Sequence, residues 1–164
     1  MKTAARRFRD YMRLMYPFWG LVAAVWLLRW IMDAAGTPAQ ITRLVSVTVA
    51  SGISILLAVL LIHWRQFGGY ASVITASLLI NIWTEGLISV AILFTILTGK
   101  TNIYSSPEYS GLLNQIEHLR AHLTFGIVTG TIVDGAVGCL FLWLLRTLVG
   151  SRKVRAVLEE KKPL

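Results

Sequence analysis

Residues 72–97 read SVITASLLINIWTEGLISVAILFTIL, an apolar stretch that contains a single charged residue, Glu85. An α-helix crosses the hydrocarbon core of a bilayer with about 20 apolar residues in succession. A strand of a membrane barrel would instead alternate apolar and polar residues with a period of two, and this stretch does not. The stretch therefore predicts a transmembrane helix.

Three further stretches have the same character, and they cover residues 14–32, 44–64 and 123–149. The whole chain of 164 residues is 55% hydrophobic and 15% charged, whereas a soluble domain has roughly 25% charged residues. The four stretches leave no room for a separate soluble domain. We therefore expect an all-α integral membrane protein, in which residues 1–164 form one membrane domain, an antiparallel bundle of four transmembrane helices.

Basic residues lie mainly on one side of these four stretches. On that side are Lys2, Arg6, Arg7, Arg9, Arg13, Arg65, Arg146, Arg152, Lys153, Arg155, Lys161 and Lys162. The other side has Arg43, Lys100 and Arg120, and Arg29 lies inside the first stretch. Because Lys and Arg are enriched in the cytoplasmic segments of membrane proteins, we expect both termini in the cytoplasm. The expected location is the cytoplasmic (inner) membrane of a bacterium.

Three segments outside the four stretches have predicted roles. Residues 1–16 are basic with apolar residues at helical spacing, which predicts an interfacial helix joined to the first span at Pro17. Residues 98–122 form a long outer loop, whose second half has helical spacing and is expected to lie along the outer membrane surface. Residues 150–164 form a basic cytoplasmic tail. We expect anionic lipid headgroups at both termini, and no nucleic-acid partner, because the basic residues flank apolar spans and include no recognition motif.

Small or polar side chains recur every four residues in three of the stretches. They are Ser77, Asn81, Glu85 and Ser89 in 72–97, Gly126, Gly130, Asp134 and Gly138 in 123–149, and Ser46, Ala50, Ser54 and Ala58 in 44–64. Residues four apart lie on one face of a helix. Small residues on such a face let helices approach closely in lipid, so these positions predict helix-packing seams.

Packing alone does not explain the charged residues inside the predicted spans. Counted along the helices at 1.5 Å per residue, Arg29, Glu85 and Asp134 all lie roughly 20–22 Å from the cytoplasmic ends. A charge at the centre of a bilayer costs roughly 2.5–3.5 kcal/mol on insertion scales, so it normally has a partner. Together with Asn81, these residues predict an intramembrane polar layer.

Three arrangements of this layer are open from the sequence. Arg29 can neutralise Glu85 or Asp134 as a structural clamp. Alternatively, Arg29 can reach Asp33 and leave the two acids together, in which case one of them holds a proton and the site suits proton relay or cation binding. Thirdly, one acid can pair with a basic residue of another subunit.

A second candidate site is expected at the outer face, where His118 and His122 lie four residues apart beside Glu117. This spacing can bind a metal, but no Glu follows the first His as it does in zinc proteases. The chain also has no Gly-rich phosphate loop, no cysteine pair and no recognisable Ser-His-Asp order. We therefore expect no catalytic residues of a familiar kind, no metal and no cofactor.

Three functions are compatible with these patterns. The favoured one is an accessory or structural subunit of a larger membrane assembly or homo-oligomer, with other membrane subunits or a second copy as partners. The alternative is a transporter or channel for protons or small cations that uses Glu85 and Asp134. The third is a membrane enzyme acting on a lipid or quinone at the outer face through Glu117, His118 and His122. The transporter ranks below the subunit because four helices are few for an alternating-access transporter.

Overall fold

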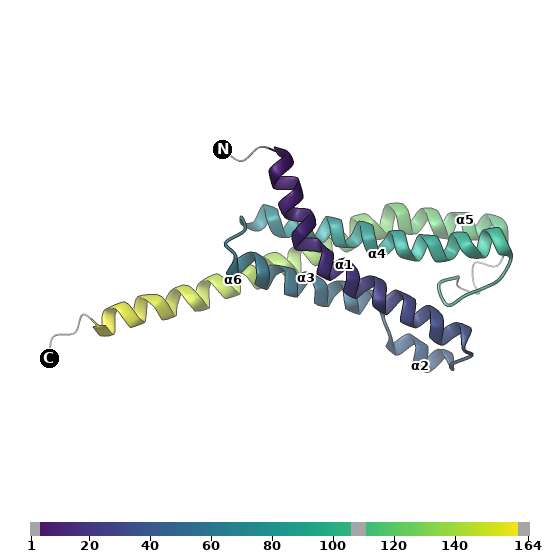
Figure 1. Ribbon diagram of the computed structural model, residues 1–164, viewed down its shortest axis with the longest axis horizontal. Coiled ribbons are helices and arrows are strands. Elements are labelled where there is room, and N and C mark those ends of the chain that lie inside the picture. Colours follow the sequence, from purple (N-terminus) through teal and green to yellow (C-terminus); the bar gives the residue numbers. More distant parts are fainter. Residues whose placement is uncertain (1–3, 106–110, 161–164) are drawn as a thin grey trace.

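The computed structural model describes residues 4–105 and 111–160, and within them the side chains of 9–105 and 111–148. All the regular elements in these ranges are helices (Figure 1). They are α1 (Ala4–Ala34), α2 (Ala39–Leu44), α3 (Val47–Trp64), α4 (Tyr70–Thr98), α5 (Leu112–Ala121) and α6 (Ile127–Glu160). A π-helical segment, η2 (His122–Gly126), joins α5 to α6.

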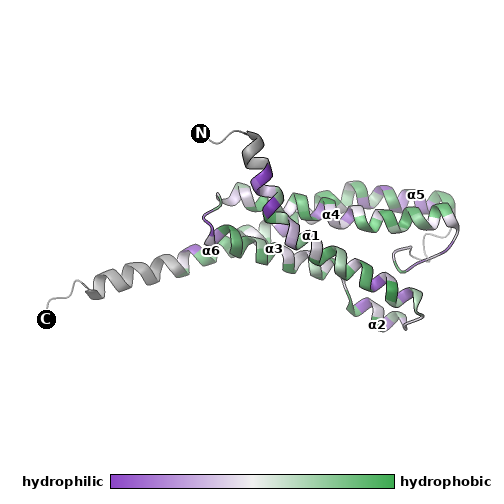
Figure 2. Cartoon of the chain, viewed as in Figure 1, coloured by the Kyte–Doolittle hydropathy of each residue, from purple (hydrophilic) through white to green (hydrophobic). Residues whose placement is uncertain are grey.

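Four helical segments are long and apolar enough to cross a membrane. They are Arg9–Ala34, Ala39–Trp64, Tyr70–Thr98 and Leu112–Leu148. Figure 2 shows that apolar residues dominate these helices, with polar residues concentrated towards the ends of the bundle. The prediction of an all-helical chain with four helices of this kind is confirmed.

The helices form a bundle around α4, which packs against α1, α3 and α6. Helix α1 begins and helix α6 ends on the same side of this bundle, which we call the terminal end (Figure 1). Helix α2 and the connection from α4 to α5 lie at the opposite end, which we call the loop end. At the terminal end, Arg146 of α6 donates a hydrogen bond to the Gly68 carbonyl oxygen in the α3–α4 turn, so α4 and α6 run antiparallel.

Two apolar clusters fill the bundle, one towards each end. Leu14, Ile55, Ile62 and Val73 belong to the cluster at the terminal end, whereas Val22, Val47, Ile88 and Ile92 belong to the cluster at the loop end. The helix positions between the clusters carry buried polar side chains, namely Ser51 and Ser54 on α3 and Asn81 and Thr84 on α4. The core is therefore apolar at both ends and polar in its middle.

The first helix differs from the prediction at its N-terminal half. It does not end at Pro17 but runs through it as one helix from Ala4, and Figure 1 shows that α1 changes direction in this half. A proline inside a helix bends it because the ring removes one backbone hydrogen bond and crowds the preceding turn. The segment before Pro17 also packs against the bundle, since Leu14 and Met15 are buried and Tyr11 donates a hydrogen bond to Ser72 Oγ at 2.8 Å.

The long connection before the fourth span is shorter than predicted. The helical spacing after residue 111 does form a helix, α5, but this helix continues through η2 into α6 and packs along the loop-end half of α4. Gly111, with φ at +92°, is the N-cap residue of α5. The apolar positions of this segment continue the pattern of the fourth span, which favours one long helix over a separate surface helix.

Two smaller differences concern the second span. Residues 39–44 form the short helix α2 inside the first connection, and α3 then begins at Val47. Ser46 is the N-cap of α3 and accepts a hydrogen bond from the Val49 N–H at 3.3 Å; a side-chain oxygen at this position satisfies a free N–H group of the first turn. The other small residues expected in this seam, Ala50, Ser54 and Ala58, are buried.

The expected lipid contacts at the two termini involve residues beyond the described part. Lys2, Lys161 and Lys162 lie outside the described residues, as do the side chains of Arg6, Arg7, Arg152, Lys153 and Arg155. The backbone of α6 is described to Glu160, so the segment expected to be a tail from residue 150 continues the last helix as far as Glu160.

Candidate functional site

The polar face of α4 lies directly on the glycine seam of the fourth span. Gly126 sits opposite Glu85, Gly130 opposite Asn81, and Gly138 opposite Val73. A Cβ atom at Gly126 would lie 2.8 Å from Glu85 Oε2, and one at Gly130 would collide with the Asn81 amide. Gly126 and Gly130 therefore leave space for polar side chains that project from α4 between the two helices, and Gly138 leaves space for an apolar one.

Asn81 connects the two helices in the middle of the membrane-spanning region. Its Nδ2 group donates one hydrogen bond to the Ser77 carbonyl oxygen and one to Asp134 Oδ2 on α6, both at 2.9 Å. The Asn81 side chain is buried, with the residue 4% exposed. Asp134 thus has an uncharged hydrogen-bond donor as its partner on α4.

Glu85 is hydrogen-bonded to a histidine. His122 Nδ1 lies 2.5 Å from Glu85 Oε2, and the two side chains are 26% and 15% exposed. On the other side of the same ring, His122 Nε2 lies 3.1 Å from His118 Nε2. One carboxylate and two imidazoles therefore form a continuous hydrogen-bonded chain, which we call the Glu85–His122–His118 chain.

The location of the histidines differs from the prediction. His118 and His122 were expected at the outer membrane surface, but the structure places His122 level with Glu85, roughly 20 Å from either end of α4 at 1.5 Å per residue, and His118 one helical turn nearer the loop end. The cause is the extension of the fourth span back to Leu112, which moves α5 from the surface to the side of α4. The two predicted sites are therefore one site.

The π-helical segment η2 begins at His122 itself. A π-turn accommodates one extra residue in a helix and changes the direction of the side chains that follow, and such turns are frequent at functional sites. Here it lies at the point where the α5 histidines meet the glycine seam of α6. The helix thus changes register between the part that carries His118 and the part that carries Gly126 and Gly130.

Glu117 was predicted to share a site with the histidines that follow it in the sequence, but in the structure it lies apart from them. Its carboxylate pairs with Arg120 at 3.7 Å on the exposed side of α5, where the Glu117 side chain is 69% exposed. The hydrogen-bonded acid is Glu85 instead. In the part of the chain that the structure describes, no group of three His, Cys, Asp or Glu side chains is placed to hold a metal ion.

Arg29 lies outside this site. Its guanidinium group is 5.1 Å from the centre of the Tyr104 ring at the loop end. Among the side chains described, no ion pair within 4 Å joins it to Glu85, Asp134 or Asp33. The clamp between Arg29 and an intramembrane acid is therefore not formed, and neither is the Arg29–Asp33 pair of the second arrangement. Asp134 is hydrogen-bonded to Asn81 and Glu85 to His122. The pairing of an acid with another subunit stays a prediction.

Several buried hydroxyl groups surround the site. Ser77 and Thr84 on α4, and Ser51 and Ser54 on α3, have buried side-chain oxygens without a hydrogen-bond partner in the protein. An unsatisfied buried polar group costs about 1–3 kcal/mol, and internal water commonly satisfies such groups. The middle layer of the bundle thus offers hydrogen-bonding groups on both sides of Asn81.

Comparisons of the chain with protein-family models, with curated proteins and with solved structures gave no match.

Proposed function

We propose that this protein moves protons across the membrane and that the Glu85–His122–His118 chain is the relay. The observation that carries the proposal is this chain itself: three titratable side chains in successive hydrogen-bond contact, at 2.5 and 3.1 Å, that start from Glu85 in the middle of α4, a helix long and apolar enough to span a membrane. Intramembrane chains of acids and histidines are typical of proton pathways.

Each member of the chain can pass a proton to the next. When His122 carries its proton on Nδ1, it donates to the Glu85 carboxylate, and its Nε2 accepts from the Nε2–H of His118. A proton that binds His118 at Nδ1 then allows the Nε2 proton to move to His122 Nε2. The Nδ1 proton of His122 then moves to Glu85 Oε2, in the same direction along the chain. The result is a neutral His118, a neutral His122 and a protonated Glu85.

A second titratable group continues the path towards the terminal end. Asp134 is hydrogen-bonded to Asn81, one helical turn from Glu85 along α4. The buried hydroxyls of Ser77 and Thr84 flank Asn81 on the same helix. Water held by these groups would connect the protonated Glu85 to Asp134, because internal water bridges polar groups that do not touch directly.

The charge distribution supports an orientation for this pathway. The terminal end carries twelve basic residues by sequence, and the loop end carries Arg43, Lys100 and Arg120. Under the positive-inside rule the terminal end lies in the cytoplasm, here of a bacterial inner membrane, and His118 is on the side of the relay that faces outwards.

The direct test uses the wild-type chain reconstituted in liposomes that contain a pH-sensitive dye. A potassium diffusion potential set with valinomycin drives protons inwards, and the internal pH is followed over time. We expect internal acidification well above that of protein-free liposomes. Flux equal to the protein-free leak, at both acidic and neutral external pH and with folding verified by circular dichroism, would contradict the proposal.

A second candidate function is that of a subunit in a larger membrane assembly or a homo-oligomer. It is favoured by the low burial of the fourth span, of which 17% is buried against 44% for the second and third. Apolar side chains are exposed along this helix at Ile132, Val133, Val137, Leu140 and Leu144. Mass determination after mild detergent extraction tests this candidate: a complex with other subunits or with further copies of the chain supports it, and a monomer contradicts it.

A further inference from the structure

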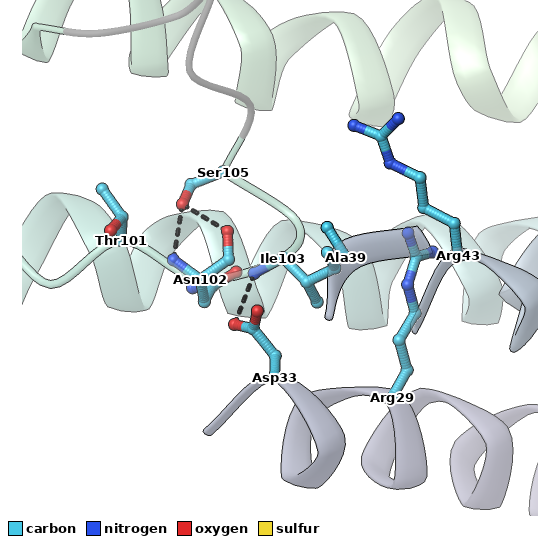
Figure 3. A pocket seen from close by; sticks show the side chains of 8 residues that line it. All are labelled: Arg29, Asp33, Ala39, Arg43, Thr101, Asn102, Ile103 and Ser105. Carbon is cyan, nitrogen blue, oxygen red and sulfur yellow. Dashed lines mark hydrogen bonds between the residues drawn. The ribbon is translucent and has the colours of Figure 1, made fainter. Parts of the chain in front are cut away.

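A cavity of about 770 Å³ opens at the loop end of the bundle. The end of α1, the short helix α2 and the segment after α4 form its walls. Arg29 and Asp33 come from α1, Arg43 from α2, and Asn102, Ile103 and Ser105 from the third wall (Figure 3). This cavity contains none of the relay residues.

The charged groups of the cavity are arranged unequally. Figure 3 shows Arg29 and Arg43 one above the other, with both guanidinium groups extended to the same side. Asp33 lies apart from them and accepts a hydrogen bond from the Ile103 N–H at 2.9 Å. With two arginines and one aspartate, the lining has a formal surplus of one positive charge.

Arg29 is held in place without an anionic partner of its own. Its charge lies over the Tyr104 ring, and its Nε is buried and makes no hydrogen bond to the protein. Burial raises the pKa of the Tyr104 phenol above its ordinary value, although Arg29 partly opposes the shift. The phenol therefore stays neutral at physiological pH, and Tyr104 supplies the arginine with a ring face rather than a negative charge.

The opposite wall is rigid because its polar groups bond to one another. Asn102 Nδ2 donates to the Ala91 carbonyl oxygen at 2.8 Å and to Thr95 Oγ1 at 2.9 Å. The Asn102 N–H donates to Ser105 Oγ, whose hydroxyl donates to the Asn102 carbonyl oxygen. A wall with its own hydrogen bonds keeps its shape and does not compete for the guanidinium groups.

We propose that this cavity binds a phosphate group between Arg29 and Arg43. The planar guanidinium group matches phosphate oxygens with two parallel hydrogen bonds, and a buried arginine donor is stabilised by such a partner. The phosphate belongs either to an anionic phospholipid headgroup of the surrounding leaflet or to a soluble phosphorylated molecule. This inference does not depend on proton transport.

Two probes distinguish the sources. Purified full-length protein in an uncharged detergent is titrated with inorganic phosphate by calorimetry, and separately with phosphatidylglycerol by native mass spectrometry. Arg43 is exposed, so the Arg43→Gln variant should still fold. It should raise the Kd of whichever probe binds the wild type at least about tenfold. Arg29→Lys keeps the positive charge but cannot donate two parallel hydrogen bonds to one phosphate, so it should weaken binding as well.

Lys100→Gln is the matched control, because Lys100 is exposed at the same end but does not line the cavity. It should bind as the wild type does. Binding of phosphatidylglycerol alone identifies a lipid headgroup, and binding of inorganic phosphate identifies a soluble phosphorylated ligand. If neither probe binds, or if Arg43→Gln and Lys100→Gln bind equally well, the proposal is overturned.

Discussion

Replacing Glu85 with glutamine is expected to reduce proton flux in liposomes to the level of the protein-free leak. The amide keeps the size of the carboxylate and can still hydrogen-bond to His122, but it does not take up and release a proton at physiological pH. The hydrogen-bonded chain then ends at His122, and a proton that arrives there has no acceptor at the required place. Flux is measured with the dye and diffusion potential used for the wild type.

Glu117→Gln provides the control for this experiment. It makes the same chemical change one residue from His118, but on an exposed side chain that pairs only with Arg120 among the contacts found. Surface ion pairs contribute little to stability, about 0–1 kcal/mol. Flux in Glu117→Gln should therefore equal that of the wild type. Equal flux in Glu85→Gln and the wild type would exclude Glu85 from the pathway.

The second large effect concerns the close contact between α4 and α6. Gly130→Ala is expected to destabilise the protein by about 1–3 kcal/mol, the usual cost of overpacking a tight site. The new Cβ atom would lie 2.9 Å from Asn81 Cγ. Asn81 cannot move aside without losing its bonds to Ser77 and Asp134. This cost outweighs the gain of up to about 1 kcal/mol that alanine brings to a helix through its higher propensity.

Gly135→Ala on the same helix is the control, because its Cβ atom would meet Ile74 at an ordinary 4.0 Å. The free energy of unfolding is measured for both variants by denaturation in mixed micelles and is compared with that of the wild type. We expect Gly130→Ala to unfold more easily and Gly135→Ala to be as stable as the wild type or more stable. The same stability for both variants would mean that Asn81 does not fill the space above Gly130.

The helical architecture was predictable because membrane-spanning helices carry a strong local signal. The stretch 72–97 and its three counterparts exceed the length that a bilayer requires, and no tertiary contact is needed to recognise them. The boundaries were less predictable. Pro17 reads as a helix end, but the packing of Leu14 and Met15 in the core keeps α1 continuous around it.

The site was predictable in its parts but not in its pairings. The four-residue spacing placed Asn81 and Glu85 on one face of α4 and the glycines on one face of the fourth span. The partner of Glu85 was missed because His122 was assigned to a surface loop. A signal was present: residues 112–123 have helical spacing that continues into the apolar stretch, and a continuous antiparallel helix brings His122 level with Glu85.

Arg29 shows why depth alone does not identify a partner. Three charged residues counted at one height suggested an ion pair, but Trp19 packs against Trp83 and Trp30 against Phe94, so Arg29 lies about two helical turns nearer the loop end than Glu85. In the structure it reaches the loop end, where Tyr104 and the cavity lie. The segment that carries Tyr104 is tied to α1 through the hydrogen bond from its hydroxyl to the Trp26 carbonyl oxygen, and the sequence pattern does not contain this contact.

The hydrogen-bonded chain from Glu85 to His118 is tested most directly by nitrogen NMR of the protein with ¹⁵N-labelled histidine in lipid nanodiscs. The protein contains three histidines. His63, in the last turn of α3, lies outside the hydrogen-bonded chain and serves as an internal reference. In Glu85→Gln we expect the ring nitrogen signals of His122 and His118 to shift and those of His63 to stay unchanged. Unchanged signals for all three histidines would contradict the relay.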